Sequence, residues 1–173
     1  DDTKISHLKA AVTDEIIALL EGKFGKMTVT RGPEHMFLGM TIKFHGDGTA
    51  SICMPSYIQE AIDESGLHIT KHSPTPCASS LLTIDPVSPV LPTKRARTFH
   101  SIVAKLIYVG TRAWTDILLA LGFLCSRVSN PTEQDEKKLR RLLEYLSGTK
   151  DMSLRLGANS LSQFMTWVDA SFA

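Results

Sequence analysis

The chain has 173 residues and a mass of 19.0 kDa, with 43% hydrophobic and 21% charged residues. This composition is that of an ordinary globular protein, and it excludes collagen, coiled-coil and disordered chains. The 19 lysines and arginines nearly balance the 18 aspartates and glutamates. A net charge of +1 gives no overall sign of a nucleic-acid or membrane partner, so any electrostatic site must be local.

Cysteine spacing and apolar runs indicate the expected cellular setting. Cys53, Cys77 and Cys125 lie far apart without a C-x-x-C pattern, which argues against a zinc site and against a disulfide framework. The longest apolar run, 117–125, is far shorter than a membrane span, and no signal segment opens the chain. We therefore expect an intracellular chain with reduced cysteines. Because it begins without methionine and stops after a strand-like stretch, we also expect it to be a piece of a longer protein.

The apolar pattern of residues 1–70 predicts a small antiparallel sheet flanked by helices. Apolar residues recur with helical spacing after Thr13, a candidate N-cap, and again after Pro55. Alternating segments surround the turn residues Gly46-Asp47-Gly48, which predicts a hairpin. In chain order, the predicted elements are a strand at 2–7, a helix at 13–24, strands at 27–30, 36–44 and 49–54, and a helix at 55–66.

The second half is predicted to be helical after a proline-rich connector. Five prolines lie between Lys71 and Thr93, which excludes a helix there. Thr132 with Asp135 resembles a capping box. Helical periodicity predicts a three-helix bundle formed by residues 97–109, 116–127 and 132–146. Alternation predicts two more strands, at 153–156 and 164–168. The fold class is therefore α+β, with expected divisions at 1–70, 71–96, 97–150 and 151–173.

Two places carry carboxylates in a pattern suited to a metal ion. Asp1 and Asp2 are adjacent, and neighbouring like charges repel unless a cation or solvent screens them. Carboxylate oxygens are the ligands that Mg²⁺ prefers. Asp169 follows the strand at 164–168, and an acid at the end of a buried strand is a candidate metal ligand. The alternatives are a solvated terminal pair for Asp1-Asp2 and a plain edge residue for Asp169.

The helix at 97–109 carries a pattern suited to a nucleic-acid duplex. His100, Ala104 and Tyr108 lie on one stripe, with Lys105 alongside. A small residue permits close backbone approach, an aromatic ring packs on sugars, and cations contact phosphates. The cations that precede the stripe are Lys94, Arg95 and Arg97. The alternative is an amphipathic helix with a solvated face.

A second basic cluster lies in the helix at 132–146. Its members are Lys137, Lys138, Arg140 and Arg141, and they are offset by Glu133, Asp135, Glu136 and Glu144. We interpret this cluster as a salt-bridged exposed face rather than a nucleic-acid site. The histidines show no metal-ligand pattern, and the chain has no nucleophile-elbow, P-loop or dinucleotide-binding motif. Hydrolase, nucleoside-triphosphatase and dehydrogenase functions therefore lack support.

Several short motifs, taken in order, resemble the C-terminal part of the reverse transcriptase of copia-type LTR retrotransposons. Asp1-Asp2 is similar to the end of that family's Tyr-x-Asp-Asp motif, and Phe37-Leu38-Gly39 to its primer-grip hairpin. Residues 99–108 resemble the thumb helix that follows the template–primer minor groove, and Val168-Asp169-Ala170 resembles the first strand of the ribonuclease H domain. The other similar pieces are Tyr57-Ile58, Thr75-Pro76, Asp116-Ile117, Asn130-Pro131 and 145–149. The resemblance runs along the whole chain.

The resemblance implies an RNA-directed DNA polymerase that copies RNA into DNA by two-metal nucleotidyl transfer, followed by a ribonuclease H domain. It implies Asp1, Asp2 and Asp169 as catalytic and Mg²⁺-binding residues. It implies nucleic-acid contacts at Phe37, Leu38, Gly39, His100, Ala104, Lys105 and Tyr108. The implied partners are RNA template, DNA primer, RNA–DNA hybrid and deoxynucleoside triphosphates, without a membrane, in cytoplasmic virus-like particles or the nucleus.

The sequence also departs from the family's pattern. Phe99-His100 stand in place of Tyr-Arg, Ala104 in place of Gly, and Ser171 in place of a second acid after Asp169. We expect the isolated chain to be inactive, because the fingers and most of the palm are missing. Two alternatives stay open: a thumb-like module that binds RNA–DNA hybrid without chemistry, and a small structural helical domain.

Overall fold

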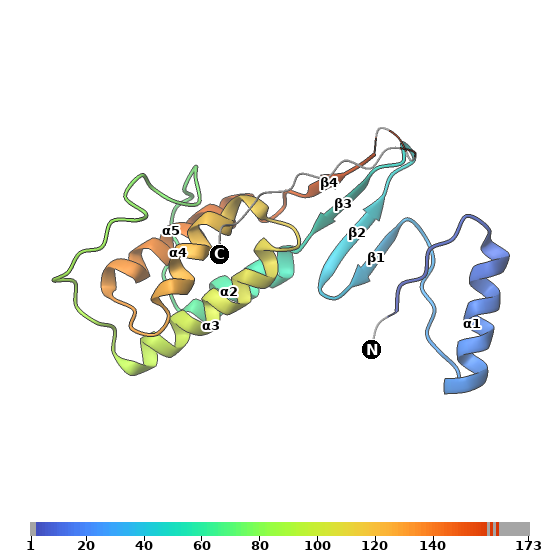
Figure 1. Ribbon diagram of the computed structural model, residues 1–173, viewed down its shortest axis with the longest axis horizontal. Helices are drawn as coiled ribbons and strands as arrows, with labels where there is room; N and C mark the ends of the chain where they lie inside the picture. The colour runs from blue at the N-terminus through green and yellow to red at the C-terminus, as the bar shows by residue number, and fades with distance from the viewer. Residues whose placement is uncertain (1–2, 159, 161, 163–173) are drawn as a thin grey trace, which may run out of the picture.

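The computed structural model describes residues 3–158, 160 and 162, and over these residues the fold is α+β. A strand meander lies beside a group of packed helices (Figure 1). The elements within the described residues are α1 (Ala10–Phe24), β1 (Glu34–Phe37), β2 (Met40–Phe44), β3 (Ala50–Cys53), α2 (Pro55–Ser65), α3 (Thr93–Gly110), the 3-10 turn η1 (Thr115–Ile117), α4 (Leu118–Arg127), α5 (Glu133–Thr149) and β4 (Leu154–Leu156).

The first hairpin of the sheet lies where the sequence predicted one continuous strand at 36–44. Phe37 of β1 pairs with Met40 of β2, and the chain reverses through Leu38 and Gly39. Both turn residues have positive φ, 50° and 74°, as a two-residue hairpin turn of matching twist requires. Leu38 adopts this conformation at a steric cost that glycine does not have. The prediction of a single strand was wrong because it counted alternation and passed over this turn.

The sheet of the described residues has four strands in the order β1-β2-β3-β4, each antiparallel to its neighbour. β4 adds to β3 and is also tied to the β2–β3 turn, where Arg155 donates to Thr49 Oγ1 at 3.2 Å and pairs with Asp47. The sequence analysis assigned the strand at 153–156 to a separate domain, and in the structure it completes this sheet. The second strand of that predicted domain, 164–168, lies outside the described residues.

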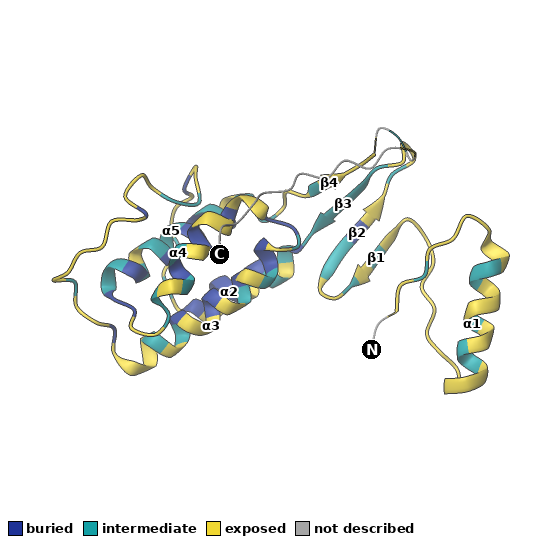
Figure 2. Cartoon of the chain, in the orientation of Figure 1, coloured by how far each residue is buried: buried dark blue, intermediate teal, exposed yellow. Residues whose placement is uncertain are grey.

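The core lies among α2, α3, α4 and α5, where the buried residues gather (Figure 2). α3 buries one stripe at helical spacing, and α5 does the same with its leucines. These stripes consist of Phe99, Ile102, Val103, Leu106 and Val109 on α3, and Leu139, Leu142, Leu143 and Leu146 on α5. α2 contributes Ile58, Ala61 and Ile62, so it joins the three helices that the sequence analysis grouped as a bundle.

The predicted helix starts at Pro55 and near Thr132 agree with the structure, whereas those of the helices α1 and α3 do not. The capping box at α5 is confirmed: the Thr132 hydroxyl accepts from the Asp135 amide, and the Asp135 carboxylate accepts from the Thr132 amide at 2.9 Å. α1 begins at Ala10, so the predicted cap Thr13 lies inside it. α3 begins at Thr93, directly after Pro92, and therefore takes in the end of the predicted connector. The predicted strand at 27–30 is absent from the described residues, where it has no pairing partner.

α1 lies apart from the helical core (Figure 1). Within the described part of the chain it buries none of its side chains, and Leu19 and Phe24 are largely exposed. An ion pair between Asp14 and Arg31 joins it to the segment that follows. Over the same residues, none of the helices combines the length and apolar character that a membrane span requires.

Candidate nucleic-acid interface

The β1–β2 turn meets the C-terminal end of α3. The Tyr108 hydroxyl donates a hydrogen bond to the carbonyl oxygen of Leu38 at 2.7 Å, across 70 residues of chain. Leu38 itself remains about half exposed, so the turn presents an apolar side chain at the surface while its backbone is held. The structure therefore brings together Leu38, Gly39 and Tyr108, which the sequence analysis had assigned to one nucleic-acid surface on separate elements.

Two tyrosines and an arginine stack at this junction. The rings of Tyr57 on α2 and Tyr108 on α3 lie 5.3 Å apart between centroids with an angle of 30°. The Arg112 guanidinium lies 3.5 Å from the Tyr108 centroid, a cation–π distance. A Cβ on Gly39 would lie 3.6 Å from Tyr57, an ordinary contact, so the need for glycine there comes from its positive φ rather than from crowding.

Lys105 is held by α2. Its ammonium lies 2.8 Å from a carboxylate oxygen of Glu60 and 2.8 Å from one of Glu64, and 5.3 Å from the centroid of the Tyr57 ring. Burial favours the neutral amine, but the hydrogen bonds and charges of the two carboxylates outweigh it and raise the pKa of Lys105. The side chain is only 17% exposed. A phosphate would therefore have to compete with two carboxylates for this lysine, and its role as a nucleic-acid contact stays a prediction.

His100 and Ala104 lie on the exposed face of α3, ahead of Tyr108 on the same stripe. His100 precedes Tyr108 by eight residues, which is about 12 Å along a helix. Ala104 adds only a methyl group to this face. Phe37, at the end of β1, is half-buried. The predicted contacts thus form two groups: a junction around the turn, and an open helix face that leads away from it.

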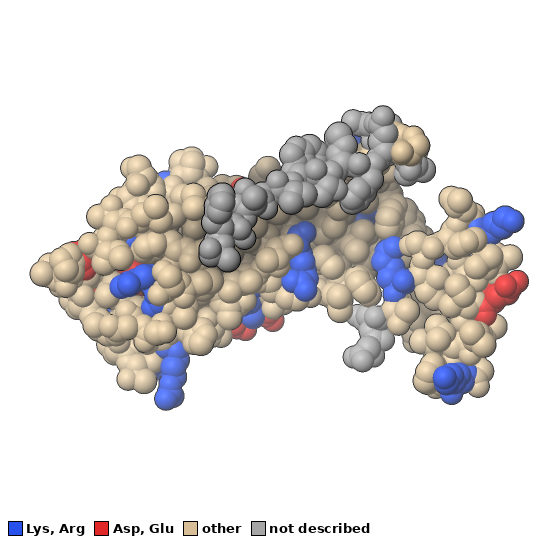
Figure 3. All heavy atoms as spheres, viewed as in Figure 1, with Lys and Arg blue, Asp and Glu red and all other residues tan. Residues whose placement is uncertain are grey.

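The cations near the start of α3 differ in how they are held. Arg95 donates to Glu136 at 3.0 Å and lies 3.8 Å from Glu133, both on α5, so it joins two helices. Lys94 and Arg97 are exposed and have no side-chain partner within residues 3–158, 160 and 162. On the face shown in Figure 3, Lys and Arg side chains are scattered rather than gathered in one continuous patch. Lys94 and Arg97 are therefore the cations of α3 that are available to a phosphate backbone.

The basic cluster of α5 is not the salt-bridged face that the sequence analysis predicted. The acids of this helix turn to other partners: Glu133 and Glu136 to Arg95, Asp135 to Arg127, and Glu144 to Ser73. In the described part of the chain, no carboxylate lies within ion-pair distance of Lys137, Lys138, Arg140 or Arg141. The prediction was wrong because charge balance along a helix does not specify which side chains face one another.

The three residues that the resemblance implies as metal ligands lie outside the described residues: Asp1, Asp2 and Asp169. The structure therefore gives no test of a magnesium site there. Among the described residues, no three His, Cys, Asp or Glu side chains come together as a metal site would require. Sequence reasoning missed Arg112, Glu60 and Glu64 at the junction. A cation four residues after Tyr108 was a usable signal for Arg112, whereas the glutamates reach Lys105 only through the packing of α2 on α3.

Comparison with known proteins places the chain beside a transposon protein. An uncharacterized mitochondrial protein of Arabidopsis thaliana is 28% identical over 177 aligned positions, which cover 100% of this chain and 69% of the relative. A protein of Saccharomyces cerevisiae named for the transposon Ty5-1 is 28% identical over 140 positions, which cover 81% of this chain and 45% of the relative. The chain thus spans only part of the length of each. No family model matches the chain, and no solved structure matches it.

Proposed function

We propose that this chain is the segment of a copia-type retrotransposon reverse transcriptase that runs from the end of the palm through the thumb to the start of ribonuclease H. In this proposal its task is to hold the RNA–DNA template–primer. The observation that carries it is the contact between Tyr108 and Leu38, because it joins the primer-grip-like turn to the thumb-like helix. The ordered motifs along the chain and the similarity to a Ty5-1 transposon protein support the same assignment.

The geometry suits a duplex that lies along α3 and ends at the turn. The exposed face of α3 offers His100 and the small Ala104, which allow close approach of a nucleic-acid backbone. Lys94 and Arg97 supply positive charge near the start of the helix. Leu38 and Gly39 stand at the other end, held by Tyr108. A primer terminus placed at the turn would have its duplex on the α3 face.

Binding of RNA–DNA hybrid by the 173-residue chain tests the holding role. Reversing both Lys94 and Arg97 to Glu should weaken hybrid binding about tenfold or more and reduce the salt slope of binding by about two, since each neutralised phosphate contributes about 0.9 to that slope. The control reverses Lys23 and Lys26, which are equally exposed but belong to α1 and the segment after it. Equal affinity of the wild-type chain and the Lys94/Arg97 variant would contradict the proposal and favour the structural helical domain.

Polymerase activity is proposed for the parent polypeptide rather than for this chain alone. A longer chain that carries the upstream palm should extend a DNA primer on an RNA template in the presence of Mg²⁺. Asp1→Asn should abolish that extension while hybrid binding persists. Hybrid binding without extension in the longer chain would instead favour the alternative, a module that binds hybrid without chemistry.

A further inference from the structure

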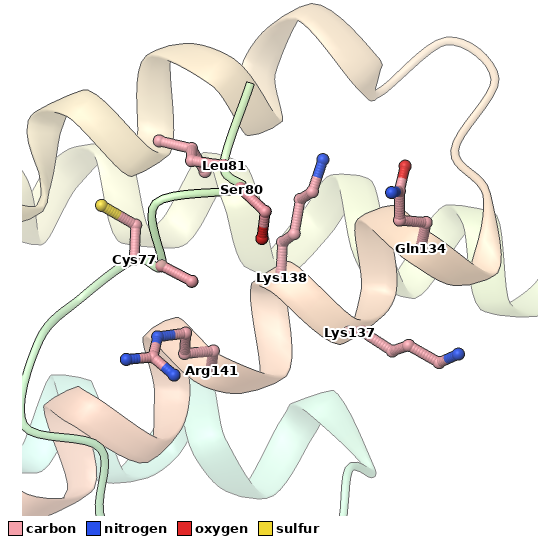
Figure 4. Close-up of a pocket in the computed structure, with 8 residues that line it drawn as sticks. Cys77, Ser80, Leu81, Gln134, Lys137, Lys138 and Arg141 are labelled. Atoms are coloured by element: carbon pink, nitrogen blue, oxygen red, sulfur yellow. The ribbon is translucent and has the colours of Figure 1, made fainter. Parts of the chain in front are cut away.

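A basic pocket lies where the proline-rich segment crosses α5, away from the α3 face described above. It has a volume of about 210 Å³ and opens to solvent on one side. That volume exceeds several-fold the space that one water molecule needs. The residues that matter for its chemistry are Ser80 and Leu81 of the crossing segment, and Gln134, Lys137, Lys138 and Arg141 of α5 (Figure 4). We call this the connector pocket.

The lining of the connector pocket carries three cations and, in the part of the chain that the structure describes, no carboxylate. The acids of α5 are turned to other partners, as described above. The nearest carboxylate of the crossing segment, Asp85, accepts from the backbone of Val87 at 3.0 Å. The lining is therefore positive, with Asp135 acting on Lys138 from outside it, and this balance favours an anionic ligand.

Several of its hydrogen-bond donors also lack acceptors. Arg141 Nε is buried and has no partner within the described residues, while its Nη2 donates to Thr75 Oγ1 at 3.0 Å. The Gln134 side-chain oxygen accepts from the Asp85 amide at 2.9 Å, which leaves the amide nitrogen of Gln134 to donate. The Ser80 hydroxyl has no hydrogen-bond partner among the described residues and points toward Lys138 in Figure 4. Because Arg141 Nε is closed off from solvent, the donors of the lining that remain for a bound acceptor are the Gln134 amide nitrogen and the Ser80 hydroxyl, and Arg141 contributes its charge.

The other two cations of the lining are Lys138 and Lys137. Lys138 donates to the carbonyl oxygen of Thr83 at 2.6 Å and lies 4.1 Å from the centroid of the Phe123 ring, so its position is well defined. Burial lowers its pKa, and an anion in the pocket would favour the charged form again. Lys137 points outward from the rim in Figure 4 and adds charge without direct contact.

We propose that the connector pocket binds a phosphate group. A guanidinium, a hydroxyl, a side-chain amide and an ammonium line the pocket from two elements, and the outer oxygens of a tetrahedral anion can accept from neighbouring members of this set. The source can be inorganic phosphate, a mononucleotide or the terminal phosphate of a nucleic-acid strand, which share this chemistry. The site is independent of the proposed duplex surface, because none of its residues belongs to α3 or to the β1–β2 turn.

Titration of the 173-residue chain with inorganic phosphate, at constant ionic strength in chloride, tests the site by NMR. The amide signals of Ser80, Leu81 and Gln134 should shift in a saturable way. Arg141→Gln should weaken binding about tenfold or more, since hydrogen bonds between charged groups are the strong ones. Arg140→Gln is the matched control: it removes the same charge from the neighbouring position, outside the pocket lining.

A second variant guards against loss of folding in Arg141→Gln. Ser80→Ala lies on the exposed crossing segment and should weaken phosphate binding severalfold while the spectrum keeps its dispersion. The proposal fails if phosphate causes no saturable shift, or if Arg140→Gln weakens binding as much as Arg141→Gln.

The source of the phosphate is assigned with two further ligands. Tighter binding of a 5′-phosphorylated oligonucleotide than of its 5′-hydroxyl counterpart, with the difference lost in Arg141→Gln, assigns a strand end to the pocket. Equal binding of the two oligonucleotides, with saturable binding of adenosine monophosphate or inorganic phosphate, assigns a free anion. Arg141→Gln should leave binding of an RNA–DNA hybrid with 5′-hydroxyl ends unchanged, so failure of this site and failure of the proposed function are separate results.

Discussion

The Tyr108 hydroxyl donates a 2.7 Å hydrogen bond to the carbonyl oxygen of Leu38, so the last turn of α3 fixes the turn between β1 and β2. Met40 of β2, with Ile52 and Cys53 of β3, also packs against the helical core, and Met54 lies in that core between β3 and α2. A carbonyl in a strained turn is thereby given a donor from a side chain whose ring is itself stacked on Tyr57. This contact orients the sheet edge relative to the exposed face of α3.

Removing that hydroxyl should loosen the turn without disturbing the ring stack. Tyr108→Phe is expected to lower the free energy of unfolding by about 1 kcal/mol, the usual net value of one hydrogen bond. Amide exchange around Leu38 should accelerate. Tyr57→Phe is the control, because the Tyr57 hydroxyl has no hydrogen-bond partner among the residues described while its ring makes the same stack. Urea unfolding of the two variants measures the difference, and equal effects would contradict the role assigned to Tyr108.

The close approach of α3 and α4 depends on Gly110. A Cβ there would lie 2.9 Å from Leu121 Cδ1 and 3.2 Å from Ile117 Cγ1, nearer than a core normally accepts. Gly110→Ala should therefore destabilise the protein by about 1–2 kcal/mol through overpacking. Gly122→Ala on α4 should instead stabilise it by about 0.5–1 kcal/mol, since its methyl would meet no described atom within 4 Å and the unfolded chain would lose freedom. Thermal unfolding should show shifts of opposite sign.

The cap of α5 is a second point of stability. The Thr132 side chain accepts from the Asp135 amide, and its hydroxyl donates to the Asp135 carboxylate at 2.8 Å. Thr132→Ala should lower the free energy of unfolding by about 1–2 kcal/mol, because both contacts are buried. Thr111→Ala removes a hydroxyl that bonds only to carbonyl oxygens of its own helix and to Arg112, so it should cost about 0.5 kcal/mol or less. Denaturant midpoints for the two variants test the ranking.

Tyr145 makes stability depend on alkaline pH. Its hydroxyl donates to Asp116, and that hydrogen bond, with burial, raises the pKa of Tyr145 from 10.0 to about 12. The folded state holds the phenol proton more tightly than the unfolded state, so this contribution is complete below pH 10.0 and is lost as the pH rises to about 12.

The test compares wild type with Tyr145→Phe. Their difference in unfolding free energy should be about 1 kcal/mol at neutral pH. This value is smaller than a buried charged pair would give, because solvent screens a partly exposed hydrogen bond. It should shrink toward zero near pH 12. Asp116→Asn keeps an acceptor but removes the charge, and should move this loss to lower pH. A difference that stays constant with pH would show that the hydrogen bond does not control the titration.

Helices were the elements that the sequence predicted best, because one period of apolar residues identifies the helix and its apolar face. Whether that face is buried is a separate matter, since α1 buries none of its side chains. The leucines of α5 and Ile102, Val103 and Leu106 of α3 are core residues, as their periodicity predicts, whereas Ile107 of α3 is 40% exposed. The capping box at Thr132 was equally visible, since its partners lie three residues apart. Alternation alone missed the turn at Leu38-Gly39, because a leucine with positive φ is rare, whereas the family resemblance pointed to a hairpin at Phe37-Leu38-Gly39.

The candidate site was predictable only in part. The sequence predicted several of the nucleic-acid contacts, among them Leu38, Gly39, His100, Ala104 and Tyr108. The structure brings three of these, Leu38, Gly39 and Tyr108, together at one junction. That Lys105 would be held by Glu60 and Glu64, and that the α5 cations would face the crossing segment instead of their neighbouring acids, required contacts between residues far apart in sequence.

By itself, the sequence determined which segments are helical, which of their faces are apolar and where the α5 cap lies, because these depend on residues within one or two turns of each other. Only the tertiary structure decided how charges pair, where β4 joins the sheet and which turn α3 holds. The physical reason is the distance along the chain over which each kind of interaction acts. Backbone periodicity and capping are local, whereas ion pairs, strand pairing and cavities depend on which surfaces meet when the apolar faces of α2, α3, α4 and α5 are buried together.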